Sequence, residues 1–91
     1  MNNQDHISEI LNRVGEVVSR KNHDYDHAFD KACDLLGPSY AAGKIYEKTS
    51  RIITLSHSEP LVVGESLKDA LEDCIGYCAL YLNRLETNKQ E

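Results

Sequence analysis

Residues that break helices are scarce in this chain. Its 91 residues include five glycines and two prolines, and there is no tryptophan. Pro38 and Pro60 both fall between stretches with an apolar period. This scarcity favours long helices.

Basic charge is scarce as well. The chain has ten lysines and arginines and fifteen aspartates and glutamates, which gives a net charge of −5. A broad basic face for duplex nucleic acid or for an anionic membrane is therefore not expected. The longest nearly apolar run, 74–82, is too short to span a bilayer, and the polar first six residues lack a signal-peptide pattern. The three cysteines cannot all pair within one chain, so we expect reduced thiols and a cytoplasmic location.

The length allows one domain. A chain of 10.3 kDa has no room for a second core and buries little surface by itself, so oligomerisation is expected. Apolar residues recur with a helical period in four segments, and we predict an all-α four-helix domain spanning residues 1–91. The predicted helices span residues 5–20, 24–36, 39–55 and 65–85, and residues 87–91 are predicted to form a frayed tail.

The apolar positions of these segments predict which side chains are buried. In the second segment they are Tyr25, Ala28, Phe29, Ala32, Leu35 and Leu36. In the third they are Ala42, Ile45, Thr49, Ile52 and Ile53. In the fourth they form a seam of Leu67, Ala70, Leu71, Cys74, Cys78, Leu82 and Leu85.

The third segment carries the strongest local group of cations. Lys44, Glu47, Lys48 and Arg51 fall within about 100° of one another on a helix, opposite the isoleucines. Lysine and arginine one turn apart can hold a phosphate or diphosphate. The alternative is a solvated face with a weak Glu47–Arg51 pair.

The fourth segment carries a ladder of acids. Glu65, Asp69, Asp73 and Tyr77 recur every four residues, and repeated like charges at this spacing destabilise a helix. The ladder therefore needs a cation, either Mg²⁺ or the Lys/Arg face of the third helix, unless solvent alone screens it. Gly76, in the middle of this helix, indicates that another group packs closely there.

Two further patterns on the second segment are weaker. Asp26, Asp30 and Asp34 form another i, i+4 ladder that we assign to solubility. His23 and His27 have a metal-compatible spacing, but no third soft ligand has a fixed spacing to them. The chain has no P-loop, no G-x-S-x-G and no H-E-x-x-H motif.

Three blocks in order resemble a known family. Lys21-Asn22-His23-Asp24-Tyr25, followed by Ala28-Phe29, is similar to its K-N-x-D-Y-G-x-x-F motif. Residues 44–52 resemble its [DE]-K-x-x-R-[IL] motif, and residues 65–77 resemble E-S-x-x-D-x-x-x-D-x-x-x-Y. Together they resemble the nucleotide modification associated domain 1 family, small proteins of bacteriophages and prophages.

This resemblance implies a helical domain that binds or acts on nucleotides, in the cytoplasm of a host cell if a phage encodes it. A more distant resemblance, to the all-α MazG-like nucleoside triphosphate pyrophosphatases, implies Mg²⁺ held by acids of two helices and a dimer or tetramer. The positions that match the motifs are Asp24, Tyr25, Glu47, Lys48, Arg51, Glu65, Asp69, Asp73 and Tyr77. The chain departs from the family at Asp26, where glycine is usual, and it lacks the E-E-x-x-E of the pyrophosphatases.

Binding is therefore expected in preference to turnover. The first hypothesis is a binder that sequesters a phosphorylated nucleotide, for example a phage protein that removes a defence signal. Its predicted ligand contacts are Lys44, Lys48, Arg51, Asp24, Tyr25 and Tyr77. The alternatives are a Mg²⁺-dependent pyrophosphohydrolase with metal on Glu47, Glu65, Asp69 and Asp73, and a helical interaction module without a ligand.

Self-association is the last expectation. The fourth helix has more apolar circumference than its partners in this chain would cover, with Tyr77, Leu80 and Tyr81 left beside the seam. We predict a homodimer or a higher symmetric oligomer formed through the first or the fourth helix.

Overall fold

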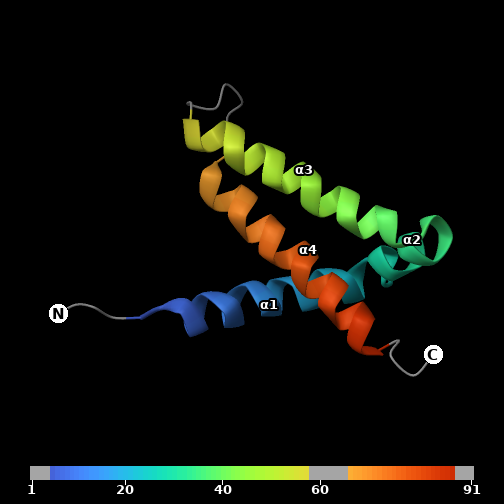
Figure 1. Cartoon of the computed structure of the whole chain (residues 1–91). Coiled ribbons are helices and arrows are strands. Elements are labelled where there is room, and N and C mark those ends of the chain that lie inside the picture. Colours follow the sequence, from blue (N-terminus) through green and yellow to red (C-terminus); the bar gives the residue numbers. More distant parts are fainter. Residues whose placement is uncertain (1–4, 58–65, 88–91) are drawn as a thin grey trace.

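A computed structural model describes residues 5–57 and 66–87, and these residues form four α-helices with no strand (Figure 1). The helices are α1 (Ile7–Asp24), α2 (Ala28–Leu36), α3 (Pro38–His57) and α4 (Leu67–Thr87). The all-α class predicted from the sequence is confirmed. No helix within the described ranges is both long and apolar enough to cross a membrane.

The boundary between α1 and α2 differs from the prediction. We expected the first helix to end at Arg20, but it continues to Asp24 because nothing in Lys21-Asn22-His23 prevents a helical conformation. The helix stops where Asp26 takes a left-handed backbone angle of φ 58°. Residues 58–65 and 88–91, which include the predicted start of the last helix, lie outside the described residues.

The turn after α1 is a Schellman motif. The backbone N–H of His27 donates to the carbonyl of Asn22 at 2.8 Å, and that of Asp26 donates to the carbonyl of His23 at 3.0 Å. Asp26 is the residue past the C-cap, where the left-handed conformation favours glycine. A glycine here, as in the K-N-x-D-Y-G-x-x-F motif that the sequence resembles, would adopt this conformation without strain.

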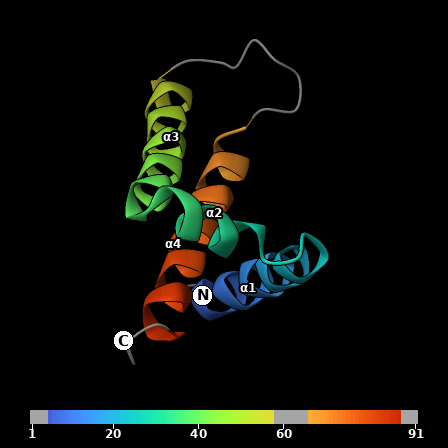
Figure 2. The same cartoon turned by 90° about the vertical axis from the view of Figure 1, so that its right-hand side faces the viewer.

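The helices pack as an antiparallel α3–α4 pair with α1 on one side of it. Figures 1 and 2 show α3 and α4 running in opposite directions side by side, with α1 crossing behind α4 in the view of Figure 1. The short helix α2 joins α1 to α3 (Figure 2). It packs against the start of α3 and the second half of α4.

The core lies between α2, α3 and α4. Phe29, Cys33 and Ala41 form its buried centre. Tyr40, Tyr77, Leu80 and Tyr81 pack around these three residues, so the three residues of the last helix that we expected to be left over are part of the core. The prediction was wrong for Tyr25, Ala28, Leu35 and Leu36, which are exposed on α2 or just before it.

The orientation of α4 is also different from the predicted one. Five residues of the predicted seam, Leu67, Leu71, Cys78, Leu82 and Leu85, lie on the surface, and Ala70 is the seam residue that is buried. The face with Gly76, Tyr77 and Leu80 points inward instead. The reason is that aromatic and glycine positions on the acidic side pack against Phe29 and α1, which outweighs the larger number of leucines on the other side.

α3 shows the same kind of shift. Ile45 and Ile52 are half-buried, as predicted, but Ala42, Thr49 and Ile53 are exposed. The α3 residues buried or half-buried with these isoleucines include Ala41, Lys44 and Lys48. Lysine stems can cover apolar surface while their ammonium groups stay in water, so charged residues share the packed side of this helix.

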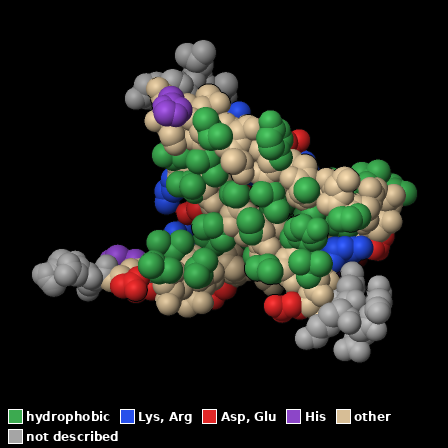
Figure 3. All heavy atoms as spheres, viewed as in Figure 1, with side chains coloured by type: hydrophobic (Ala, Val, Ile, Leu, Met, Phe, Trp, Pro, Cys, Tyr) green, Lys and Arg blue, Asp and Glu red, His purple; other side chains and the backbone are tan. Residues whose placement is uncertain are grey.

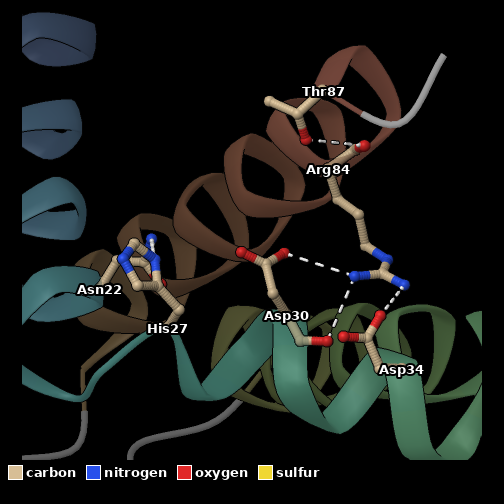
Figure 4. A network of polar contacts seen from close by, with 6 residues as sticks. All are labelled: Asn22, His27, Asp30, Asp34, Arg84 and Thr87. Carbon is tan, nitrogen blue, oxygen red and sulfur yellow. Dashed lines mark hydrogen bonds and ion pairs between the residues drawn. The ribbon is translucent and has the colours of Figure 1, made fainter. Parts of the chain in front are cut away.

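Arg84 near the end of α4 ties this helix to α2 (Figure 4). Its guanidinium donates to the carbonyl of Asp30 at 3.2 Å and to the carboxylate of Asp34 at 2.6 Å. It also lies 3.7 Å from the Asp30 carboxylate. The assignment of Asp30 and Asp34 to solubility alone was therefore wrong: these acids hold α2 against α4. Asp26 instead accepts a hydrogen bond from Lys31 at 2.6 Å.

Candidate functional site

A cleft of 610 Å³ opens between α1, α2 and α4. Three aromatic rings line it: Phe29 of α2, Tyr40 at the start of α3 and Tyr77 of α4. The ring centroid of Phe29 lies 5.8 Å from that of Tyr40 and 6.1 Å from that of Tyr77. Tyr25, which is 65% exposed, adds a fourth ring from the turn after α1. The volume lies within the range of small-molecule sites, which is about 300–1,000 Å³.

Gly76 sets the distance between the two long walls. A Cβ atom added at Gly76 would lie 3.0 Å from Cγ2 of Val18, which is tighter than most Cβ contacts, so α1 and α4 approach each other closely at this glycine. The expectation that a group packs against this glycine is confirmed. Val14, Val17 and Val18 form the apolar part of the α1 wall.

The α1 wall also carries cations. Arg13 donates to the carboxylate of Glu72 across the cleft at 2.8 Å. Lys21 lies two helical turns after Val14, on the same face of α1. The backbone carbonyl of Lys21 accepts a hydrogen bond from the N–H of Tyr25, but its ammonium has no hydrogen-bond or ion-pair partner among residues 5–57 and 66–87. The cleft therefore contains a cation that is available to a ligand.

The opposite wall, on α4, is acidic. Asp69, Glu72 and Asp73 line it. Asp69 takes part in the N-terminal cap of α4: its backbone N–H donates to Oγ of Ser66 at 3.0 Å, and the Ser66 hydroxyl donates to its carboxylate at 2.8 Å. The S-x-x-D part of the third motif thus has a structural role, since it closes the first turn of this helix.

Two lysines of α3 border the cleft without lining it. The ammonium of Lys48 lies 3.2 Å from the carboxylate of Asp73. The ammonium of Lys44 lies 5.8 Å from the ring centroid of Tyr40 and 6.0 Å from that of Tyr77, which is within cation–π distance. It also lies 3.7 Å from Glu47. The charged side of α3 therefore contacts the acidic side of α4 directly.

The sequence-predicted residues divide into three groups. Tyr25, Tyr77, Asp69 and Asp73 line the cleft, and Lys44 and Lys48 contact its lining residues. Asp24, Glu47 and Arg51 are exposed and are not among the lining residues. Glu65 lies outside the described residues.

Three of the four predicted metal ligands, Glu47, Asp69 and Asp73, lie in the described part of the chain. Among residues 5–57 and 66–87, no group of three or more histidine, cysteine or acidic side chains is arranged to hold a metal ion. Asp69 and Asp73 share one wall, and each already has a partner, in Ser66 and Lys48 respectively. Two carboxylates suit Mg²⁺ when phosphate oxygens supply further ligands, so these two residues fit a metal that arrives with a ligand.

Arg13, Lys21, Phe29 and Tyr40 were not among the predicted site residues. A signal for Lys21 was present, because it continues the Val14–Val18 face if the first helix is extended past Arg20. Arg13 gave no such signal: it lies at the edge of that face, and only the position of Glu72 on another helix shows its role.

The family model of nucleotide modification associated domain 1 matches residues 21–85. The chain belongs to this family. No curated protein and no solved structure matches the chain. In this nucleotide modification associated domain 1 protein, the first motif forms the Schellman turn, the second contains the lysines of α3, and the third forms the capped start of α4. All three motifs lie around the cleft. The more distant MazG-like resemblance stays a prediction.

Proposed function

We propose that the cleft binds a phosphorylated nucleotide and retains it without turnover. The observation that carries this proposal is the convergence in one cleft of aromatic rings and Lys21, whose ammonium has no partner in the described part of the chain, in a protein from a nucleotide-associated family. The base stacks on an aromatic ring, and the phosphates lie toward the lysines. Stacking of a base on such a ring is worth about 1–3 kcal/mol in proteins that bind single-stranded nucleic acid.

Lys21 and Lys48 are the proposed phosphate-binding residues. The Lys21 ammonium has no partner among the described residues, whereas the ammonium of Lys48 lies 3.2 Å from the Asp73 carboxylate and has to leave it to bind a phosphate. The Asp73 carboxylate then becomes available for a ribose hydroxyl or for Mg²⁺ that enters with the phosphates. Mg²⁺ would supply charge neutralisation for the phosphates, with Asp69 and Asp73 as its protein ligands.

Retention without turnover is proposed because hydrolysis between phosphates needs more than a phosphate contact. Metal charge has to stabilise the negative charge that develops and has to activate a water molecule. The E-E-x-x-E block is missing, and the carboxylates of the α4 wall already have Ser66, Arg13 and Lys48 as partners. The phage-type role that follows is sequestration of a nucleotide signal.

Isothermal titration with AMP, ADP, ATP and cyclic AMP and their guanine counterparts, each with and without Mg²⁺, tests this proposal. For the nucleotide that binds best, Lys21→Ala removes a charge-assisted hydrogen bond, and we expect affinity to fall about 10- to 100-fold. Arg20→Ala is the matched control, because Arg20 is the neighbouring cation on α1 and does not line the cleft; its affinity should not change.

The other outcomes separate the remaining hypotheses. Loss of affinity in Arg51→Ala but not in Lys21→Ala would place the site on the exposed cations of α3 and would contradict the cleft. Release of pyrophosphate or phosphate from a triphosphate in the presence of Mg²⁺ would show the alternative enzyme. If none of these nucleotides binds, the proposal is wrong and the helical interaction module remains.

A further inference from the structure

The α3–α4 pair has an apolar side that faces away from α1 and the cleft. On α4, Leu67, Leu71, Cys78, Leu82 and Leu85 are exposed, and they fall within about 60° of the helix circumference at 100° per residue. Leu82 and Leu85 are 59% and 55% exposed. These are the seam residues that the sequence predicted to be buried, and no helix in the described part of the chain covers them.

α3 extends this surface. Tyr46 and Ile53 are 72% and 57% exposed, and Ala42 and Thr49 lie on the same side of the helix. Because α3 and α4 run antiparallel, the exposed sides of both helices turn to the same face of the pair. The ion pair between Lys48 and Asp73 lies toward the opposite, charged face.

The views of the molecule agree with this placement. Figure 2 places α1 behind the α3–α4 pair as seen in Figure 1, so Figure 3 shows the face of the pair that α1 does not cover. Hydrophobic side chains are spread over α3 and α4 on that face (Figure 3). We call it the outer face, defined by Ala42, Tyr46, Thr49, Ile53, Leu67, Leu71, Cys78, Leu82 and Leu85.

We propose that the outer face is the interface with a second copy of this chain. No charged residue belongs to the outer face, so it offers nothing to select a charged partner or a lipid headgroup. Two identical faces of this kind are complementary to each other around a twofold axis. The resulting dimer packs two α3–α4 pairs as a four-helix layer, with one cleft and one α1 on each outer side.

The size of the face approaches that of a standard protein–protein interface. Helices of 20 and 21 residues are about 30 Å long, and two of them side by side give a face on the order of 600 Å² in projection. Interdigitating side chains raise the buried area toward the roughly 800 Å² per partner of a standard interface. The small core also favours association, because a domain that buries few apolar residues gains stability from an interface. The buried hydrophobic residues within the described ranges are Val14, Phe29, Cys33, Ala41 and Ala70.

Sedimentation equilibrium over a range of protein concentrations tests the proposal. Leu82→Ala should weaken self-association by about tenfold or more, and Leu82→Glu should abolish it. Circular dichroism checks that each variant keeps its helices, and the alanine variant provides the result if the glutamate variant does not fold. Ile7→Ala is the matched control, because Ile7 is 63% exposed on α1, outside the outer face; its dissociation constant should not change.

Cys78 gives a second and independent readout. This exposed thiol lies within the outer face, so its alkylation rate, measured by mass spectrometry, should fall as the protein concentration rises through the dissociation constant. In Leu82→Ala the fall should move to a higher concentration. A wild-type chain that stays at 10.3 kDa at every concentration would overturn the proposal. So would a dimer that Ile7→Ala weakens and Leu82→Ala does not, since that result would place the interface on α1.

Discussion

Replacement of Gly76 by alanine tests the close approach of α1 and α4. The added Cβ would lie 3.0 Å from Cγ2 of Val18, which is closer than an ordinary contact and is made by a β-branched side chain that has little freedom to move. Overpacking of this kind costs about 1–3 kcal/mol. Alanine gains about 1 kcal/mol over glycine in a helix interior. We therefore expect Gly76→Ala to lower the free energy of unfolding by up to about 2 kcal/mol, the difference between these two terms.

A double-mutant cycle with Val18→Ala separates the two terms. In the Val18→Ala background the clash is absent, so Gly76→Ala should stabilise the chain by about 1 kcal/mol, the helix propensity alone. The coupling energy between the two positions is then about 1–3 kcal/mol, measurable from urea unfolding followed by circular dichroism at one fixed protein concentration. If Gly76→Ala stabilises both backgrounds equally, α1 does not pack against Gly76 and the cleft does not have the shape described above.

Two further predictions concern the turn after α1 and the core thiol. Asp26→Gly should raise Tm by about 4 °C, because glycine tolerates the left-handed backbone there and the exposed ion pair to Lys31 adds little; an unchanged or lower Tm in a thermal melt would contradict this. The hydrogen bond from Lys31 lowers the pKa of Asp26, so the small stabilisation from this pair is present above the ordinary pKa of an aspartate and is lost as the pH falls through the lowered value. The difference in Tm between Asp26→Gly and wild type should therefore widen in acid. Burial raises the pKa of the Cys33 thiol, and the residue is 3% exposed. Iodoacetamide at pH 8 should therefore leave Cys33 unmodified in the folded chain and label it in urea, as measured by peptide mass spectrometry. Fast labelling of the folded chain would place this thiol outside the core.

The fold class and the number of helices could be predicted from the sequence because they depend on local patterns. Apolar periodicity and the Gly37-Pro38 stop mark the helices without reference to any partner. The turn after α1 was harder to predict, since its left-handed residues are Asp26 and His27 and not glycine. The end of the first helix, expected at Arg20, was therefore placed too early.

The choice of the buried side of each helix could not be predicted in the same way. α4 has leucines on one side and Gly76, Tyr77 and Leu80 on the other, and a count of apolar residues favours the leucines. The structure buries the second side because Gly76 lets α1 approach and Tyr77 packs against Phe29. Both reasons depend on residues of other helices, which periodicity within one helix does not contain.

The same limit applies to the site. Tyr25, Tyr77, Asp69 and Asp73 could be selected from their motifs, and they do line the cleft. The wall opposite them comes from α1: Lys21 continues the apolar face of that helix in the sequence, but Arg13 could be assigned only when the position of Glu72 on α4 was known. Lys48 illustrates the intermediate case: its charge and its helix were identified from the sequence, but its pairing with Asp73 depends on how α3 and α4 are aligned.

Part of the cleft lies inside the segment that the family model matches and part lies outside it. The family match begins at Lys21, so the α1 residues that face the cleft before this point, Arg13, Val14, Val17 and Val18, lie outside the matched segment. The aromatic rings and the acidic wall lie inside it. The family match therefore includes most of the cleft but not the wall that α1 supplies before Lys21. Substitutions at Arg13, Val14, Val17 and Val18 would alter this wall, and with it the ligand that the cleft accepts, without redesign of the other three helices.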